Sequence, residues 1–327
     1  MRPPMPQAIR IQQHGGPEVM SLGAAPAAAP GPGEALVRVE AAGVNFIDTY
    51  HRTGLYPVPL PFTPGVEGAG VVEAVGAGVS DLASGDRVGW VMQMGSYAAA
   101  AVRPAAKLVR LPDGVSTTQA AAALLQGMTA HYLVRSTFRV QSGMPVLVHA
   151  AAGGMGLLLC QMCRALGARV FGTVSTEAKA KAALAAGADT VIRYTEQDFA
   201  EVIREELGDE RLAVAYDSVG ETTWRKSLSL LRPRGMLVLY GQSSGPVPPI
   251  DPLLLSRNGS LFVTRPTLAD YAATTDELRW RAGEVLDSVA SGKLQLTIDR
   301  ELPLARAAEA HRLLEGRATM GKLILRP

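Results

Sequence analysis

Short apolar runs alternate with helix-forming segments through the middle of the chain, from about Gly127 to Pro266. Short apolar runs bounded by turn residues are typical of strands buried on both faces of a parallel sheet. Six such strands are predicted, at Val146–His149, Arg169–Val174, Thr190–Ile192, Leu212–Tyr216, Met236–Tyr240 and Ser260–Val263. Helices are predicted between them, for example at Gly156–Leu166 and Glu177–Ala186. The fold class that follows is α/β, with a doubly wound parallel sheet.

A second pattern, rich in strands and turns, covers the first third of the chain, and a mixed pattern follows at its end. Leu36–Ala41 alternates as a half-buried strand does. The other predicted elements are strands at Gly70–Val75, Arg87–Val91, Lys322–Leu325 and around Leu294–Ile298, a loop at Ala24–Gly33, a helix containing Ala120–Leu125 that Ser116 caps, and helices at Asp276–Ser291 and Leu304–Leu314. We therefore predict a discontinuous β-rich domain (1–127 and 266–327) into which the parallel-sheet domain (128–265) is inserted.

The charge of the 327-residue chain is nearly balanced, with a net charge of +2. A nucleic-acid-binding protein normally carries a basic surplus, so nucleic acid is disfavoured as a partner. Met1–Ile11 has no apolar signal-peptide core, and no run approaches the roughly 20 apolar residues of a membrane span, so we expect a cytoplasmic protein. Cys160 and Cys163 are predicted to be core thiols, because no second ligand pair completes a zinc site.

The run from Val146 to Gly156 combines an apolar strand, a turn of small residues and a helix start. Small residues let the backbone approach a pyrophosphate, and a helix N-terminus offers free N–H groups to it. The fit to the dinucleotide pattern is Ala151, Gly153 and Gly156, with alanine in place of the first glycine. The alternative is an ordinary strand–turn–helix connection without a ligand.

Ser175 stands where an NAD-specific site usually carries the acidic residue that binds the ribose 2′-hydroxyl. A carboxylate there would repel a 2′-phosphate by about 4 kcal/mol per charge pair at 4 Å and an effective dielectric constant of 20. Ser175 removes this repulsion and Lys179 can supply attraction. The sequence therefore predicts NADPH rather than NADH as the cofactor.

The chain resembles the quinone oxidoreductase/zeta-crystallin family of zinc-independent, medium-chain dehydrogenases/reductases. The resemblance spans nearly the whole chain and is carried, in order, by Gly43–Tyr50 (GVNFIDTY), Arg52–Pro57, Pro64–Gly70, Gly85–Val88, Gly143–Arg164, Tyr216–Gly220, Val263–Pro266 and Arg317–Thr319. It implies a GroES-like catalytic domain, a Rossmann NADP-binding domain and a homodimer joined through the edge of the Rossmann sheet.

The resemblance also implies roles for individual residues. Asn45 is expected near the nicotinamide, Gly153, Gly154 and Met155 at the pyrophosphate, and Ser175, Lys179, Tyr194 and Arg317 at the adenosine 2′-phosphate. Residues expected along the cofactor cleft are Thr129, Ser218, Gly241, Gln242, Ser243, Phe262, Val263 and Arg265. Zinc-dependent relatives use a cysteine and a Gly-His-Glu segment where this chain has Asn45 and Gly65-Val66-Glu67, so we expect no metal.

Reduction of quinones by NADPH is the activity that the resemblance implies. The candidate catalytic residues are Asn45, Tyr50, Tyr56, Gln126 and Arg265. Asn45 is a possible hydrogen-bond donor to the carboxamide or to a substrate oxygen, and the two tyrosines are candidates to flank a flat ring or deliver a proton. Gln126 replaces a lysine found in some relatives, which leaves quinone selectivity open. His149 is expected to pack in the strand rather than to act in catalysis.

Two other functions stay open from the sequence. The first is NADPH-dependent reduction of α,β-unsaturated carbonyls by an alkenal or enoyl reductase, for which a tyrosine is a natural proton donor. The second is binding of AU-rich RNA, as in some zeta-crystallin-like relatives. The near-neutral charge and the lack of a mixed aromatic and basic motif disfavour RNA binding.

Overall fold

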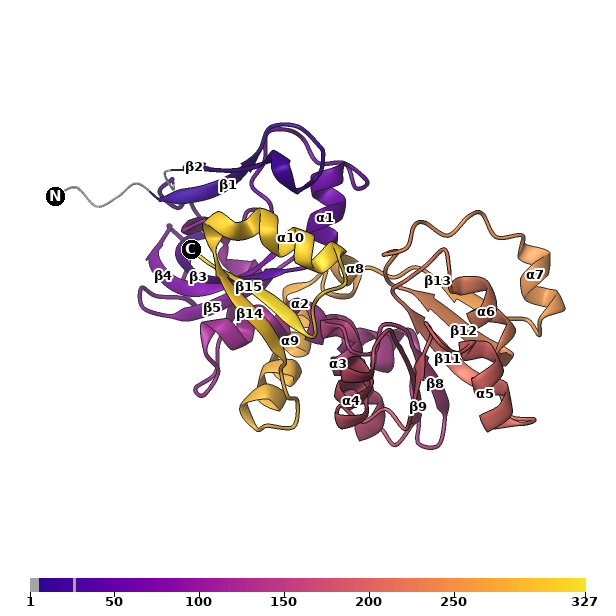
Figure 1. Ribbon diagram of the computed structural model, residues 1–327. Helices are drawn as coiled ribbons and strands as arrows, with labels where there is room; N and C mark the ends of the chain where they lie inside the picture. The colour runs from indigo at the N-terminus through magenta and orange to yellow at the C-terminus, as the bar shows by residue number, and fades with distance from the viewer. Residues whose placement is uncertain (1–5, 26–27) are drawn as a thin grey trace. The chain divides into compact units, whose positions relative to one another are not determined.

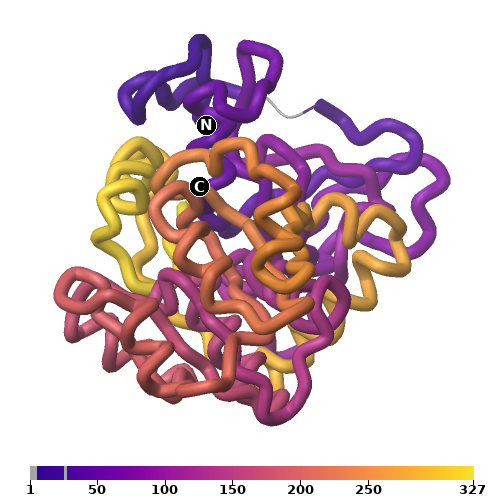
Figure 2. The backbone as a smooth tube through the Cα atoms, turned by 90° about the vertical axis from the view of Figure 1, so that its right-hand side faces the viewer, coloured from indigo at the N-terminus to yellow at the C-terminus, as the bar shows by residue number. Residues whose placement is uncertain are grey.

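Figure 1 shows the computed structural model, which describes residues 6–25 and 28–327. The chain divides into two compact units, the first comprising Met1–Met128 and Tyr271–Pro327 and the second Thr129–Asp270. Figure 2 traces the same path as a tube, in which the magenta-to-orange second unit is one continuous stretch of chain. Within the described residues, no helix is long and apolar enough to cross a membrane.

The first unit is built on a seven-stranded sheet of order β14-β15-β3-β4-β5-β7, with β6 paired to β3. Its strands are β3 (Glu34–Val44), β4 (Glu67–Val75), β5 (Arg87–Val91), β6 (Ala100–Pro104), β7 (Val109–Arg110), β14 (Ile298–Pro303) and β15 (Lys322–Arg326). Val37, Val72 and Trp90 pack together in the core of this sheet. Because β15 pairs antiparallel with β3, the C-terminal strand lies directly beside the N-terminal segment that ends at Asn45.

Helices and a hairpin complete the first unit. They are the hairpin of β1 (Gln7–Ile11) and β2 (Met20–Ala24), the helices α1 (Phe46–Thr53), α9 (Thr275–Ala290) and α10 (Ala307–Glu315), and the short helices η1 (Pro17–Val19), η2 (Ala105–Lys107) and η4 (Leu304–Arg306). Helix α2 (Thr117–Tyr132) ends in the second unit and continues as η3 (Leu133–Thr137). Asp48 fixes the start of α1, because its Oδ2 accepts a 2.9 Å hydrogen bond from the backbone N–H of Asn45.

The second unit is a six-stranded, wholly parallel sheet of order β10-β9-β8-β11-β12-β13. The strands are β8 (Pro145–Val148), β9 (Arg169–Val174), β10 (Thr190–Arg193), β11 (Leu212–Asp217), β12 (Leu231–Leu239) and β13 (Phe262–Thr264). Helices α3 (Gly154–Ala165) and α4 (Glu177–Ala185) cover one face, and α5 (Phe199–Leu207) and α6 (Trp224–Ser229) cover the other. Two further short helices are α7 (Pro252–Arg257) and, at the boundary of the units, α8 (Leu268–Tyr271). The order is that of a dinucleotide-binding sheet, which confirms the predicted fold class.

Some predicted elements differ from the structure. The strand predicted around Leu294–Ile298 is wrong, because the chain after α9 first turns back and the N–H of Leu294 bonds to the carbonyl of Ser288. Pairing begins only at Ile298, opposite Lys322. Strand β12 starts at Leu231 rather than Met236, with a register irregularity against β11. Residues 26–27 of the predicted loop and residues 1–5 of the N-terminal segment lie outside the described residues.

Candidate functional site

The turn between β8 and α3 is the candidate site for a dinucleotide pyrophosphate. A Cβ at Gly156 would lie 2.3 Å from the carbonyl oxygen of Ala150, so only glycine lets α3 approach the strand this closely. Gly153 precedes the helix in an extended conformation, and no side chain caps the helix there. The first N–H groups of a helix have no partners within it. Gly154 and Met155 therefore present backbone N–H groups from which a phosphate can accept hydrogen bonds, whereas the N–H of Gly153 bonds to the carbonyl of Ala150 at 2.9 Å.

The carboxyl ends of β9 and β10 bring together two residues predicted for the 2′-phosphate. The backbone N–H of Tyr194 bonds to the carbonyl of Val174, directly before Ser175. Tyr194 is 42% exposed. Lys179 lies in the first turn of α4, where Thr176 caps the helix through the Lys179 N–H. Arg193 forms ion pairs with Glu177 (3.7 Å) and Glu196 (2.7 Å), which offset the acidic charge beside this corner.

The carboxyl ends of β11, β12 and β13 gather a second group of the predicted cofactor residues. A Cβ at Gly241 would lie 2.6 Å from the carbonyl oxygen of Ser218, and the N–H of Ser243 bonds to that same oxygen. Gln242 lies between Gly241 and Ser243 in the sequence. The guanidinium of Arg265 bonds to the carbonyl of Leu239 at 2.9 Å, at the end of β12. Parallel sheets bind their ligands at this edge of the strands.

Phe262 and Val263 lie before the carboxyl end of their strand, and two other predicted residues, Thr129 and Arg317, belong to other parts of the chain. Phe262 pairs with Met236, three residues before the end of β12, and Val263 pairs with Leu237. Phe262 is 55% exposed on the outermost strand of the sheet. Thr129 is buried in the last turn of α2, where the second unit begins. Arg317 belongs to the first unit, after α10.

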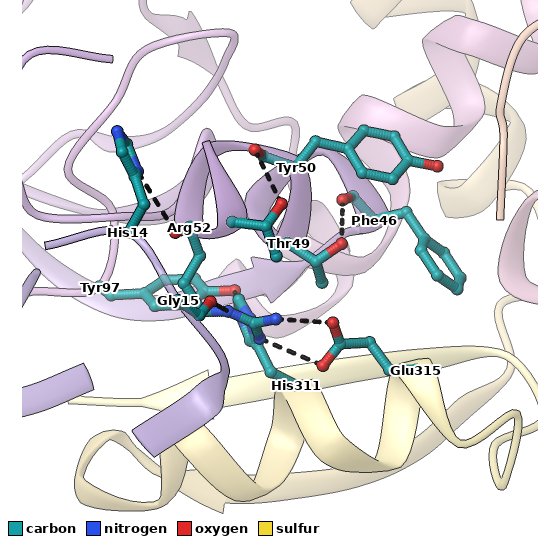
Figure 3. A network of polar contacts seen from close by, with 10 residues as sticks. His14, Gly15, Phe46, Thr49, Tyr50, Arg52, Tyr97, His311 and Glu315 are labelled. Carbon is teal, nitrogen blue, oxygen red and sulfur yellow. Dashed lines mark hydrogen bonds and ion pairs between the residues drawn. The ribbon is translucent and has the colours of Figure 1, made fainter. Parts of the chain in front are cut away.

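In the first unit, α1 and the loop after it bring the two predicted tyrosines together. The rings of Tyr50 and Tyr56 meet edge to face at 5.2 Å between centroids, and the Tyr56 N–H bonds to the Tyr50 carbonyl. Phe46 lies 6.3 Å from Tyr50, and Figure 3 shows both rings on the same side of α1. This half-exposed aromatic group is a surface on which a flat ring can stack.

Asn45 takes part in a buried polar cluster with two residues on neighbouring strands. Its Oδ1 accepts a 2.6 Å hydrogen bond from Nζ of Lys322, and its Nδ2 donates to Oε2 of Glu67 at 2.9 Å. Lys322 and Glu67 form an ion pair of 2.6 Å. The other oxygen of Glu67 accepts the backbone N–H of Leu125, next to Gln126 on α2. Asn45, Glu67 and Lys322 are 4%, 0% and 2% exposed.

These donors do not fit a zinc site. An amide occupies position 45 and a valine position 66, and both oxygens of Glu67 are held by N–H donors and by an ammonium group. A zinc ion needs three or four nitrogen, sulfur or carboxylate ligands. In the described part of the chain, no group of three or more His, Cys, Asp or Glu side chains could hold a metal.

A second buried network joins α1 to α10 (Figure 3). The hydroxyl of Tyr97 donates to Asp48 Oδ2 at 3.0 Å and lies 3.2 Å from Nε2 of His311. The guanidinium of Arg52 lies 2.9 Å from Nδ1 of His311 and is paired with Glu315 at 2.6 Å. Burial raises the pKa of Asp48 to about 7, against the lowering effect of its hydrogen bonds to Asn45 and Tyr97. Burial and then the charge of Arg52 lower the pKa of His311 to about 3.

Other polar residues that drew attention in the sequence are structural. His149 is buried, with Nδ1 2.9 Å from the hydroxyl of Thr173 and Nε2 2.8 Å from that of Ser227. Cys160 and Cys163 are free buried thiols. Burial raises the pKa of Cys160 to about 12 and that of Cys163 further still, so neither is a thiolate at neutral pH.

The sequence did not single out Lys322, Asp48, Tyr97 or His311 as site residues. The sequence predicts Lys322 only as part of a strand, yet a lone lysine at the start of the apolar run Leu323–Leu325 is unusual for a buried strand. The position of this lysine in an apolar strand is the signal that indicates a buried, paired charge. Tyr97 and His311 carry no such signal, because nothing local in the sequence places residues separated by 214 positions in contact.

Comparisons with known proteins identify the family. Residues 31–113 match the model of the alcohol dehydrogenase GroES-like domain, and residues 154–280 match the model named zinc-binding dehydrogenase. A quinone oxidoreductase of Pseudomonas aeruginosa is 45% identical, over 99% of this chain and 100% of its own. The crystal structure of Escherichia coli quinone oxidoreductase complexed with NADPH superposes with a TM-score of 0.96 at 43% identity, covering 98% of this chain and 100% of that one. A 2-haloacrylate reductase from a Burkholderia species is 43% identical, with 99% of both chains covered. The chain therefore belongs to the quinone oxidoreductase family.

Proposed function

We propose that this protein reduces quinones with NADPH, without a metal. The observation that carries the proposal is the turn between β8 and α3. A Cβ at Gly156 would lie 2.3 Å from the carbonyl oxygen of Ala150, so this position requires glycine, and no side chain caps the start of α3. The E. coli relative of the same fold is a quinone oxidoreductase complexed with NADPH. NADPH supplies the reducing equivalents when bound, and the protein binds and orients the reactants.

Each residue group has a role in this proposal. Gly154 and Met155 bind the pyrophosphate through their backbone N–H groups, and Gly153, whose own N–H bonds to the Ala150 carbonyl, forms the turn beside it. Ser175, Lys179, Tyr194 and Arg317 are the residues proposed to select the 2′-phosphate. The residues proposed for the rest of the cofactor are Thr129, Ser218, Gly241, Gln242, Ser243 and Arg265, with Phe262 and Val263 contributing only through the strand that places Arg265. On the substrate side, the proposed residues are Asn45, Tyr50, Tyr56, Gln126 and Arg265, with the Tyr50–Tyr56 pair stacking against a flat acceptor.

A second candidate activity is the reduction of α,β-unsaturated carbonyl compounds. It is favoured by the Burkholderia relative, a 2-haloacrylate reductase that matches this chain as fully as the quinone oxidoreductases do. Such a reaction needs a proton at the α-carbon, and the edge-to-face tyrosines offer hydroxyl donors.

Two measurements on the full chain test the proposal. Calorimetry with NADPH should detect saturable, roughly stoichiometric uptake, and its absence from folded protein would refute the proposed function. Steady-state assays should then compare 1,4-benzoquinone with a simple alkenal at saturating NADPH. Faster turnover of benzoquinone supports a quinone reductase, whereas much faster turnover of the alkenal assigns the second activity.

We also propose a homodimer formed through the edge of the second unit's sheet. Strand β13 has a partner on one side only, β12, among the described residues, and Phe262 on it is 55% exposed. An open strand edge with an exposed aromatic ring is suited to pairing with the same strand of a second copy. We propose no nucleic-acid partner, since the net charge is only +2.

A further inference from the structure

The amide of Asn45 is held in one orientation by the charges around it. An ammonium group only donates hydrogen bonds and a carboxylate only accepts them. Lys322 lies on the Oδ1 side of the amide and Glu67 on the Nδ2 side, at 2.6 and 2.9 Å. Turning the amide over would place its NH₂ against the ammonium and its oxygen against the carboxylate.

The hydrogen-bonding capacity left to Asn45 follows from this orientation. Its Nδ2 has two N–H groups, one donating to Glu67 and the other to the carbonyl of Gly43 at 3.3 Å. Its oxygen accepts a bond from Lys322 and also takes part in the capping box of α1 with the Asp48 N–H, which is shared with the backbone carbonyl of Asn45 at 3.0 Å. Asn45 therefore has no N–H left to donate to a ligand, and its oxygen is the part of the amide with which a ligand donor can interact.

Several features of the fold make room for the pair that imposes this orientation. A Cβ at Gly43 would lie 2.3 Å from Oε2 of Glu67 and 2.8 Å from Cε of Lys322, so the charges fit only beside a glycine. Glu67 also holds α2 through the Leu125 N–H, one residue before Gln126. A buried ion pair by itself contributes little net stability, because desolvation offsets the attraction. Stability alone is therefore a poor account of these two charges.

We propose that Lys322 and Glu67 are positioning residues that fix Asn45 as a hydrogen-bond acceptor for the bound reactants. The inference rests on the proposed function. The ligand group that Asn45 would recognise is an N–H or O–H donor, the class that includes the amino group of the nicotinamide carboxamide. The proposal reverses the role expected from the sequence, in which Asn45 donated a hydrogen bond.

The double variant K322M/E67Q tests the proposal. It removes both charges together, so no unpaired charge is left buried, and the amide oxygen introduced at position 67 can still accept the Leu125 N–H. The NH₂ group of that new amide would then face Asn45, and the amide of Asn45 should turn over to accept from it. We expect a folded protein with a melting temperature close to the wild type and a kcat/KM for NADPH that is about 10- to 100-fold lower, the effect of losing one strong hydrogen bond. The variant R279M/D81N is the matched control, since it removes an exposed ion pair from the same unit.

Two further readouts separate this inference from the proposed function. In ¹⁵N NMR spectra of the wild type, the side-chain NH₂ of Asn45 should be protected from exchange by its carboxylate partner, and K322M/E67Q should lose that protection. Binding of 2′,5′-ADP, which lacks the nicotinamide, should be equal in both proteins. Failure of the wild type to bind NADPH contradicts the proposed function. Wild-type kcat/KM in a folded K322M/E67Q protein, or an unprotected Asn45 amide in the wild type, overturns the positioning role.

Discussion

The hydroxyl of Tyr97 donates a 3.0 Å hydrogen bond to the carboxylate of Asp48 at the start of α1. Arg52 determines which atom donates in each of the neighbouring hydrogen bonds, because a guanidinium can only donate. Nδ1 of His311 therefore accepts from Arg52, and the Nε2–H of His311 faces the Tyr97 oxygen. His311 is therefore neutral, in agreement with its lowered pKa. The network attaches the helix that follows Asn45 and carries Tyr50 to the C-terminal helix α10.

Asp48 should make stability depend on pH. Burial raises its pKa in the folded state to about 7 from the ordinary value of 3.8, so the folded protein binds more protons between these values than the unfolded chain does. The stabilising contribution is then complete below about pH 4 and is lost as the pH rises through 7, with a slope of up to about 1.4 kcal/mol per pH unit. Chemical unfolding of the wild type and D48N at several pH values measures this contribution of Asp48 to the free energy of unfolding. We expect the difference in unfolding free energy between them to shrink as the pH rises, and a constant difference contradicts the assignment.

Glu315 should matter more for stability than its neighbours on α10 because its partner is buried. Arg52 is 1% exposed and Glu315 34%, so E315Q leaves a buried guanidinium without its countercharge. Removing one partner of a fully buried pair costs about 3–5 kcal/mol, and the partial exposure of Glu315 reduces the expected loss to about 2–3 kcal/mol. E309Q on the same helix removes a carboxylate from an exposed pair with Arg306 and should leave the denaturation midpoint unchanged. Equal midpoints for the two variants would contradict this prediction.

The parallel sheet was predictable because its strands are locally encoded. Each is a short apolar run between turn residues, and all six were placed, with the least accurate bounds at β12, where an irregular register extends the strand. The strand expected around Leu294–Ile298 was misplaced because the backbone of Leu294 folds back on Ser288, a tertiary preference that alternation does not encode.

The candidate site was predictable where one segment contains it and not where distant segments meet. The turn proposed for the pyrophosphate lies within eleven consecutive residues, and Gly156 in it is packed against the backbone of Ala150 and Ala151. The partners of Asn45 come from β4 and β15, and Lys322 is 277 positions away in sequence. Only the pairing of β15 with β3 brings that lysine to the amide, so the orientation of Asn45 was not accessible from the sequence.

Lys179 should determine the preference for NADPH over NADH. It follows the carboxyl end of β9, where the ribose of a dinucleotide is expected, and Arg193 offsets the nearby charge of Glu177. K179A should raise KM for NADPH by about tenfold, the effect of losing one charge-assisted contact, and change KM for NADH little. K181A, an exposed lysine on the same helix, is the control and should change neither constant. Equal effects of K179A on both cofactors would remove Lys179 from the proposed site.

Gly156 should not tolerate even a methyl group. In G156A the added carbon would meet the Ala150 carbonyl oxygen at 2.3 Å and the Ala151 Cα at 2.6 Å, both backbone atoms that cannot move aside. We expect a destabilised turn and an NADPH dissociation constant at least about tenfold higher, measured by calorimetry. G283A is the matched control, because Gly283 lies in α9 with open space around its Cβ position. Alanine there should raise the unfolding free energy by about 0.5–1 kcal/mol and leave NADPH binding unchanged. Unaltered binding in G156A would contradict a pyrophosphate at this turn.

The proposed dimer should depend on Phe262. A charge introduced at the exposed edge of β13 would be brought beside its own copy across a two-fold interface, where like charges repel and must be desolvated. F262E should therefore shift the wild-type dimer to a monomer in light scattering coupled to size-exclusion chromatography. L184E places the same charge on α4, at a leucine that is 49% exposed, and should leave the mass unchanged. A monomeric wild type, or a dimer that persists in F262E, would rule out the β13 edge as the interface.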